Sequence, residues 1–348
     1  MAKIITFFNH KGGVGKTTLA YNVAWGLSQA GKRVLMIDGD PQCNLTEISM
    51  QGLDERGGQL NLFDDSSKAD FDLKKNNAYE YFESYIYPDR GQNPEEPMLY
   101  EKKENLYLLP GSLRFAELEE TISLAIAGIR GLNRVPQFIY EGLLKLGEDF
   151  DYIIIDLSPA LSAMNQVVLM LSDYFLVPVN PSIFSRQALE NLNQIFRTWN
   201  RNLSGFDIFS QRVKELPQML GIVCQNYRPY SRKNEENTKS AQRFEVRLDE
   251  LNYQATLLAK DLSGFGMALT EETFREIFES SDPYRIANIP DYNQLGVLSE
   301  TEKIPVNGFD NKILKGAPGG SLDVEQYRKK VEDFKTECKK IVDGLLKL

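Results

Sequence analysis

A glycine-rich loop near the N-terminus constrains this chain more than any other feature. It reads Lys-Gly-Gly-Val-Gly-Lys-Thr-Thr over residues 11–18, between an apolar run at 3–8 and a helical apolar period at 17–30. A strand, a glycine loop and a helix in this order place backbone N–H groups around a phosphate at the positive end of the helix. A glycine turn without any ligand is the alternative, and the strand–loop–helix context favours phosphate binding.

The apolar runs predict an α/β fold. A second strand at 33–38 completes a βαβ unit, and further strands are expected at 105–110, 151–156, 174–179, 219–224 and 286–290. Helical periodicity fills most of the intervals between them. We therefore expect a single domain over 1–348, with a doubly wound, mostly parallel sheet, helices on both faces, and ligands at the carboxyl ends of the strands.

Three segments depart from a minimal α/β pattern. Residues 51–104 are polar and acidic, which predicts an elaborated surface region, and residues 227–281 are longer and more charged than a crossover needs, which predicts a helical insertion. Residues 322–348 carry apolar positions at helical spacing beside several lysines, with Gly344 expected to break the helix near its end. An amphipathic membrane anchor has a similar pattern, but interspersed acidic residues favour packing on the sheet.

Composition limits the possible partners and compartments. Of 348 residues, 42% are apolar and 26% are charged, and no apolar run reaches the ~20 residues that span a bilayer. The formal net charge of −9 means that any binding to nucleic acid depends on a local basic patch. Three cysteines without a C-x-x-C pair indicate a reducing cytoplasm and favour neither a disulfide scaffold, a zinc site nor a bridging iron–sulfur cluster.

Side chains of the loop add chemistry to its backbone. Lys16 is placed to contact β- and γ-phosphates, and the Thr17 hydroxyl is placed to bind Mg²⁺. The ordinary pattern G-x-x-x-x-G-K-[ST] nevertheless fails, because His10 stands where it needs a glycine. The predicted phosphate-binding residues are Lys11, Gly12, Gly13, Val14, Gly15, Lys16, Thr17 and Thr18.

The variant K-G-G-x-G-K-T-T resembles the deviant Walker A loop of the ParA/MinD family. Asp38-Gly39-Asp40-Pro41-Gln42 is similar to the switch I of that family, and residues 153–159 (IIIDLSP) are similar to its Walker B and switch II segment, with Ser158 in place of the usual first proline. The resemblance implies an ATPase that uses Mg²⁺ and ATP. It also implies that Lys11 reaches across a dimer interface to the nucleotide of the partner.

The same resemblance assigns roles to the carboxylates. It makes Asp40 the residue that positions or activates the attacking water, and Asp38 and Asp156 the Mg²⁺-associated residues together with Thr17. Asn226, Pro290 and Asp291 resemble residues beside the base, although ordinary turns at strand ends explain them equally well. An aspartate after a strand is also a common cap or turn residue, so only the three together behind one loop favour a catalytic site.

The segment 173–192 (DYFLVPVNPSIFSRQALENL) is similar to the ParA branch. That branch implies an ATP-sandwich homodimer, non-specific DNA binding, a ParB-like or adaptor activator, and a nucleoid-associated location if DNA binding holds. A scattered set of solvated charges is the alternative to a DNA surface. The alternative function is an ATP-gated regulatory or scaffold module that recruits a protein partner or membrane system without a DNA track. The candidate DNA-binding residues are Arg197, Arg201, Arg228, Arg232 and Lys233.

Overall fold

The computed structural model describes residues 1–50, 73–87, 96–210, 214–227, 236–291, 293–315 and 321–348, and within these it contains one eight-stranded sheet. The strand order is β3-β4-β2-β5-β1-β6-β7-β8, and every neighbouring pair is parallel except β3 with β4. The predicted fold class, a doubly wound and mostly parallel sheet, is confirmed. The strands are β1 (Lys3–Phe7), β2 (Val34–Gly39), β3 (Tyr100–Lys103), β4 (Leu106–Leu109), β5 (Tyr152–Leu157), β6 (Tyr174–Val179), β7 (Gln218–Tyr227) and β8 (Arg285–Pro290).

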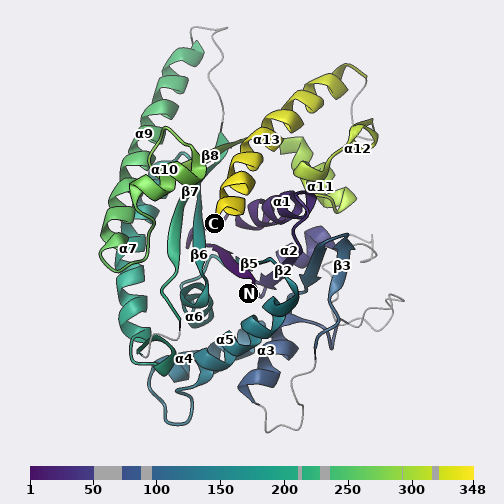
Figure 1. Ribbon diagram of the computed structural model, residues 1–348. Coiled ribbons are helices and arrows are strands. Elements are labelled where there is room, and N and C mark those ends of the chain that lie inside the picture. The colour runs from purple at the N-terminus through teal and green to yellow at the C-terminus, as the bar shows by residue number, and fades with distance from the viewer. Residues whose placement is uncertain (51–72, 88–95, 211–213, 228–235, 292, 316–320) are drawn as a thin grey trace.

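The central strands read as continuous apolar runs because helices cover both faces of the sheet. Every residue of β2 and β5 is buried. On one face lie α1 (Lys16–Gln29) and α13 (Ser321–Lys347), and on the other lie α5 (Val135–Leu146), α6 (Ala163–Leu171) and α7 (Ile183–Leu203) (Figure 1). Aromatic side chains pack between the sheet and α7. The ring centroids of Phe8, which follows β1, and Trp199 of α7 are 5.2 Å apart.

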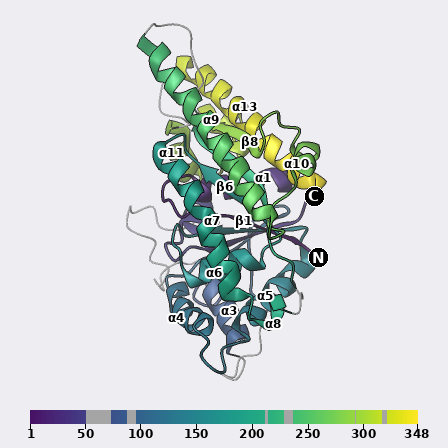
Figure 2. The same ribbon diagram turned by 90° about the vertical axis from the view of Figure 1, so that its left-hand side faces the viewer.

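The remaining helices extend these layers. The helix α4 (Phe115–Ile126) packs against α3 (Ala78–Ile86) and α6, and α9 (Glu236–Ser263) packs beside α7 (Figure 2). Short elements complete the described chain: α2 (Asn44–Ser49), α8 (Asp207–Ser210), α10 (Glu271–Phe278), α11 (Asn293–Glu302), α12 (Asn311–Lys315), and the 3-10 helices η2 (Gly147–Asp149) and η3 (Val306–Gly308).

The described part of the segment 227–281 is largely helical, and it lies in the crossover connection between β7 and β8. The strands β7 and β8 are parallel neighbours, so the chain between them has to return along the sheet, and α9 and α10 make that return. The helix α9 buries Leu251, Ala255, Leu258 and Leu262. The length of the segment therefore reflects a long helix that packs against α7 and β7, and whether it is an insertion stays a prediction.

Part of the segment 51–104 belongs to the core instead of the surface. Residues 51–72 and 88–95 lie outside the described residues, but α3 lies between them and buries Tyr79, Tyr81 and Phe82. The strand β3 adds an antiparallel edge to β4. Acidic composition concealed this helix, and two of its five buried residues are tyrosines, which tolerate both environments.

The C-terminal helix packs on the sheet, as expected. The side chains of Val331, Phe334, Cys338, Ile341 and Leu345 are all buried against α1, β8 and neighbouring elements. The expected break at Gly344 is wrong, because α13 continues to Lys347. A Cβ at Gly344 would lie 2.2 Å from the Phe278 ring, so this glycine allows α10 and α13 to approach closely.

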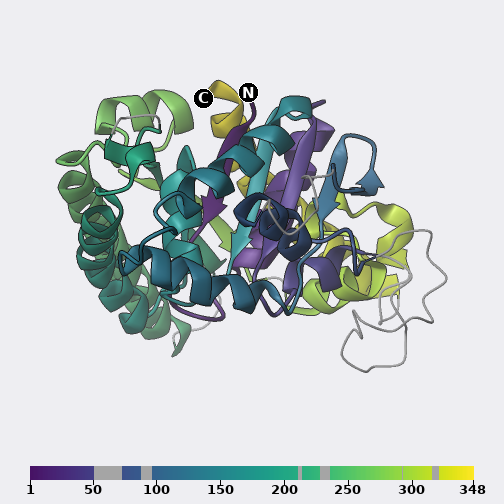
Figure 3. The ribbon, with the colours of Figure 1, turned by 90° about the horizontal axis from the view of Figure 1, so that it is seen from below.

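Both termini lie near each other at the amino ends of the strands (Figure 3). The hydroxyl of Tyr152, at the start of β5, donates to the Leu345 carbonyl over 2.9 Å and fixes the C-terminus there. The glycine loop therefore lies at the opposite, carboxyl edge of the sheet. Among the described residues, no helix has both the length and the apolar character required to cross a bilayer.

Candidate functional site

The glycine loop connects β1 to α1 at the carboxyl edge of the sheet. Gly13 and Gly15 have φ values of 70° and 76°, in the left-handed region that glycine adopts without strain. Gly15 caps α1, so the loop N–H groups gather at the positive end of a 14-residue helix. Val14 of the loop is buried, and within α1 the Thr18 carbonyl accepts from the Asn22 side chain over 2.8 Å.

Neighbouring segments close around this loop. A Cβ at Gly12 would lie 4.0 Å from the Pro159 ring, and one at Gly15 would lie 3.2 Å from Oε1 of Gln225. Pro159 follows β5 and Gln225 belongs to β7. The loop is therefore bordered by the chain after Asp156 on one side and by the end of β7 on the other.

Lys16 is the buried cation of the site. Its side chain lies at the start of α1, and burial lowers the pKa of its ammonium, while the charges of Asp156 and Asp40 oppose that shift. A buried cation beside the backbone donors of a glycine loop suits a polyanion.

Asp156, at the end of β5, is fully buried, and in the described part of the chain neither carboxylate oxygen has a hydrogen-bond donor. Burial raises its pKa to about 8, with the nearby charge of Asp38 adding to the shift and Thr17 and Lys16 opposing it. Buried polar atoms are ordinarily paired, so two orphaned oxygens beside a threonine hydroxyl fit a cation such as Mg²⁺.

The residues that could hold a metal are few. Within the described ranges, no group of three or more His, Cys, Asp or Glu side chains is arranged to bind an ion. A dedicated protein cage is thus absent from this part of the chain. Mg²⁺ is commonly bound by one or two protein oxygens together with substrate phosphates, and Thr17 and Asp156 meet that requirement.

Asp38, at the end of β2, is held by its own network. Its Oδ2 accepts from the backbone N and the Oγ1 of Thr46, over 2.8 and 2.7 Å, and its Oδ1 accepts from the Asp40 backbone N over 3.2 Å. Burial raises the pKa of Asp38 to about 6, against these hydrogen bonds. Asp38 therefore organises the chain that follows β2.

Asp40 is the third carboxylate, and its side chain is nearly buried. Its Oδ1 accepts from the Gln42 backbone N over 2.9 Å. Besides burial, the charge of Asp40 raises the pKa of Asp38, and the charges of Asp38 and Asp40 raise the pKa of Asp156. Asp156 and Asp40 also act on the pKa of Lys16. The structure therefore brings the predicted carboxylates together around the loop.

Lys11 lies at the outer side of the loop and turns toward α7. Its ammonium donates to the hydroxyls of Ser182 and Ser185 over 3.0 and 3.4 Å and lies 5.6 Å from the centroid of the Phe184 ring. Ser182 caps α7, so this cation stands at the positive end of a long helix. The helix dipole disfavours a cation there and so weakens the hold of these contacts on Lys11.

The residues predicted beside the base lie at the ends of β7 and β8. Asn226 has a φ of 55° and donates to the Asn180 side chain over 3.5 Å, while Asn180 donates to the Gly13 carbonyl over 3.3 Å. Pro290 ends β8, and the Asp291 backbone N donates to the Tyr227 carbonyl over 3.0 Å. These residues share one edge with the loop, and their contact with a base remains a prediction.

His10 is half-buried beside Lys16. Burial lowers the pKa of the imidazole, and the charge of Lys16 lowers it further. A neutral histidine next to the loop is compatible with a supporting role.

The candidate DNA-binding residues are only partly described. Arg228, Arg232 and Lys233 lie outside the described residues. Arg197 and Arg201 lie near the end of α7, where they line a depression of about 250 Å³ with Asn200, Ser204 and Phe265. The Arg197 guanidinium lies 4.9 Å from the Phe265 ring centroid, so its charge is partly engaged with that ring.

Several residues of the site were missed by the sequence analysis. Thr46 and Gly111 contact Asp38, Asn180 and Gln225 contact the loop, and Ser182 contacts Lys11. Most of these come from other strands or connections, so no local spacing points to them. Asn180 and Ser182 directly follow β6 at the same carboxyl edge. Their position after a strand is the sequence feature that could have identified these two residues.

Comparison with known proteins agrees with this geometry. The model of a protein family described as an AAA domain matches residues 2–205, more than half of the chain, including the glycine loop and all three aspartates. The chain belongs to this family. It is a P-loop protein of the ParA/MinD type and of the ParA branch, as its deviant loop indicates.

Two curated relatives illustrate the match. The chain is 32% identical over 204 residues to the sporulation initiation inhibitor protein Soj of Bacillus subtilis, and 29% identical over 205 residues to the virulence plasmid ParA family protein pGP5-D of Chlamydia psittaci. These matches cover 57% and 58% of this chain, and 65% and 66% of the relatives. The match thus spans slightly less than two thirds of the length of either relative.

Solved structures share the fold. A Borrelia burgdorferi B31 protein assigned to plasmid partition, bound to AMPPNP, is 20% identical with a TM-score of 0.54 and covers 99% of this chain and 98% of its own. An ATP complex of McdA from Cyanothece is 17% identical with a TM-score of 0.58, covering 97% and 96%. At these identities the similarity concerns the fold alone.

Proposed function

We propose that this chain is a Mg²⁺- and ATP-dependent ATPase switch that partitions or positions DNA or a protein cargo through ATP-gated dimerisation. One observation carries the proposal: among the described residues, the two oxygens of the fully buried Asp156 carboxylate have no hydrogen-bond donor, and the charge of Lys16 acts on this carboxylate. The nucleotide-bound relatives named above support a nucleotide as the ligand.

Each residue then has a distinct task. The loop N–H groups and Lys16 bind the phosphates, and Thr17 with Asp156 would hold Mg²⁺. Bound Mg²⁺ would neutralise charge that develops on the phosphate oxygens during transfer. Asp40, held by the Gln42 backbone N, orients the attacking water, and Asp38 fixes the chain that carries Asp40.

ATP-gated dimerisation rests on Lys11. Phosphoryl transfer commonly uses a cation supplied by a second subunit to stabilise the transition state. Among the described residues, the side-chain contacts of the Lys11 ammonium are with hydroxyls and an aromatic ring and not with a carboxylate, which leaves its charge for a second copy of the chain. An activator protein would act on this assembled form.

Hydrolysis is tested by phosphate release from ATP with purified protein, with and without Mg²⁺. We expect slow turnover that needs Mg²⁺. Turnover indistinguishable from that of a Lys16→Gln variant would contradict the proposal, because that variant lacks the central phosphate contact.

DNA binding is tested by co-sedimentation with non-specific duplex DNA across a salt series, using the wild type with a non-hydrolysable ATP analogue. Binding that needs the analogue and weakens with salt is expected, since phosphate contacts release counterions. Loss of binding at every salt concentration would exclude a DNA track. It would favour the alternative, an ATP-gated module that recruits a protein partner or membrane system.

A further inference from the structure

The chain between β4 and α4 makes close contact with Asp38. The Gly111 backbone N donates to Oγ1 of Thr46 over 2.8 Å, and that same hydroxyl donates to Asp38 Oδ2 over 2.7 Å. A Cβ at Gly111 would lie 3.0 Å from the Asp38 carboxyl. The segment 111–119 therefore starts in contact with residues 38–46, called the Asp38 loop below.

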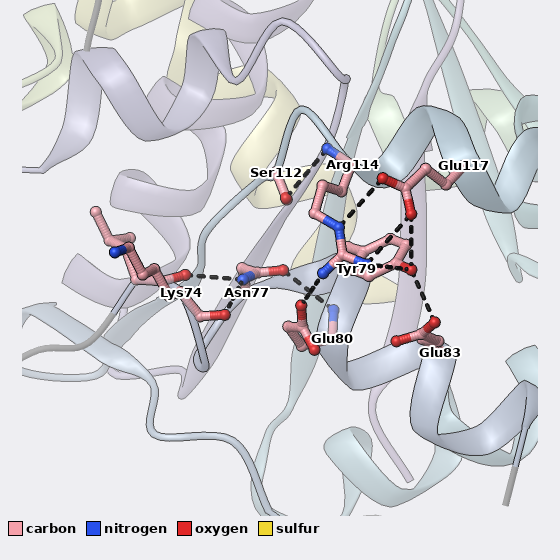
Figure 4. Close-up of polar contacts among 9 residues, drawn as sticks. Lys74, Asn77, Tyr79, Glu80, Glu83, Ser112, Arg114 and Glu117 are labelled. Carbon is pink, nitrogen blue, oxygen red and sulfur yellow. Dashed lines mark hydrogen bonds and ion pairs between the residues drawn. The ribbon is translucent and has the colours of Figure 1, made fainter. Parts of the chain in front are cut away.

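The start of α4 is fixed to α3 by a polar cluster centred on Arg114 (Figure 4). Its guanidinium donates to Glu80 over 2.6 Å and to Glu117 over 3.2 Å, and it stacks 4.0 Å from the Tyr79 ring centroid. The Tyr79 hydroxyl donates to Glu117 as well, over 3.0 Å. Several shared partners hold the first turn of α4 in one orientation, more firmly than a single exposed ion pair would.

Glu119, in the first turns of α4, contacts the helix that follows residues 156–162, called the Asp156 loop below. Its two carboxylate oxygens accept from the backbone N of Ala163 over 2.6 Å and of Met164 over 2.9 Å. These are the first two residues of α6, whose N–H groups have no partner within the helix. A carboxylate at this position is also favoured by the helix dipole.

The beginning of α6 in turn holds the loop. The Asn165 side chain donates to the Ser158 carbonyl over 2.9 Å, to its hydroxyl over 3.0 Å, and to the Ala160 carbonyl over 2.8 Å. Ser162 caps the same helix by accepting from the Asn165 backbone N over 3.1 Å. A shift at the start of α6 therefore moves the chain that follows Asp156.

We propose that Glu119 is a positioning residue for the Asp156 loop, and that residues 111–119 form a rigid bridge between that loop and the Asp38 loop. The bridge makes the two loops respond together when phosphates occupy the site. This inference rests on the proposed nucleotide function and adds a specific coupling element to it.

Two substitutions weaken the contact between Glu119 and the start of α6, one by changing the acceptor and one by removing a donor. Glu119→Gln keeps the shape of the side chain but removes the charge and one acceptor. Ala163→Pro removes one donor and leaves Glu119 intact. Proline is tolerated at the first position of a helix, and the extended backbone of Ser162, with φ −78° and ψ 159°, is compatible with a following proline. Glu120→Gln, an exposed neighbour on α4, is the matched control.

Steady-state kinetics and a fluorescence reporter distinguish a positioning role of Glu119 from a role in folding alone. We expect both variants to lower kcat for ATP about tenfold with KM within about twofold, because each variant weakens the charge-assisted hydrogen bonds that hold the start of α6. A Leu161→Trp reporter, on the exposed part of the loop, should change its fluorescence on adding Mg²⁺ and a non-hydrolysable ATP analogue, and the change should be reduced in both variants.

Unchanged kcat and an unchanged reporter response in both variants would overturn the coupling, as would a loss of thermal stability alone. Failure of the proposed function would appear differently, as absence of hydrolysis in the wild type. If the wild type does not hydrolyse ATP, the Leu161→Trp fluorescence alone tests the bridge. A fluorescence response that depends on Glu119 supports the bridge, and the absence of a response in the chain with only the reporter substitution overturns it.

Discussion

The Lys11 ammonium donates a hydrogen bond to the Ser182 hydroxyl over 3.0 Å, across a sequence separation of 171 residues. Ser182 also caps α7 by accepting from the Ser185 backbone N over 3.2 Å. The contact joins the glycine loop to the chain that follows β6. In the proposed dimer, Lys11 would have to leave this position to reach the nucleotide of the partner.

Lys11→Ala should therefore affect association more than binding. We expect affinity for a fluorescent ATP analogue within about threefold of the wild type, but dimerisation at least about tenfold weaker, or about 1.4 kcal/mol. Sedimentation equilibrium with a non-hydrolysable analogue measures the dimer. Lys329→Ala, an exposed lysine on α13, is the control. Equal dimerisation of the Lys11→Ala variant and the wild type would remove Lys11 from the interface.

Asp40→Ala should separate binding from hydrolysis. The phosphates are contacted by the loop and Lys16, which the substitution leaves in place, whereas the group proposed to orient water is lost. We expect phosphate release to fall by at least about a hundredfold, in the range for loss of a general base, with nucleotide affinity retained. Asp333→Ala on the exposed face of α13 serves as the control. Persisting turnover would show that another group positions the water.

Asp156 should make stability depend on pH. Its pKa is raised from 3.8 to about 8 in the folded chain, so the folded state binds a proton more tightly than the unfolded state. Stability without Mg²⁺ and nucleotide should therefore fall as pH rises from about 4 to about 8 and level off above that. Asp38, raised from 3.8 to about 6, adds to the fall in the lower part of this range.

Thermal unfolding at pH 5, 6.5 and 8 measures this dependence. Asp156→Asn, which is neutral throughout, should lose much less stability between pH 5 and pH 8 than the wild type. Mg²⁺ with nucleotide should restore stability at pH 8 only in the wild type, since the metal favours the charged carboxylate. Parallel pH curves for the two proteins would mean that Asp156 is not the responsible group.

Gly344→Ala tests the docking of α13. The added methyl group would lie 2.2 Å from the Phe278 ring, so α10 or α13 has to shift. Overpacking of this kind costs about 1–3 kcal/mol. Urea unfolding measures the loss. Gly205→Ala, where no atom lies within 4 Å of the new methyl, should change stability by less than about 0.5 kcal/mol. Equal stabilities for the two variants would contradict this close approach.

The site was predictable wherever its residues follow an apolar strand. The glycine loop follows β1, Asp38 and Asp40 follow or end β2, and Asp156 lies near the end of β5. Strand ends can be recognised locally because apolar runs stop abruptly at polar residues. The pairing of β2 with β5 aligns Asp38 with Asp156, so parallel register brings these two carboxylates together.

Other features could not be read from local patterns. Glu119 appears in the sequence as one of several acidic residues on an amphipathic helix, and only its contact with α6 distinguishes it. Gly344 resembles a helix breaker because its intrinsic propensity is poor. Packing against Phe278 outweighs that propensity, and α13 continues through it.

The sequence by itself determined the α/β class, the strand–loop–helix unit and the identity of the groups at the carboxyl edge. These depend on neighbours in the chain, through periodicity, glycine conformation and the direction of the strands. The tertiary structure alone decided that Lys11 turns to Ser182, that Thr46 joins Asp38 to Gly111, and that Glu119 caps α6. Those contacts join residues far apart in the chain, and their energies depend on burial and geometry that exist only after the sheet has assembled.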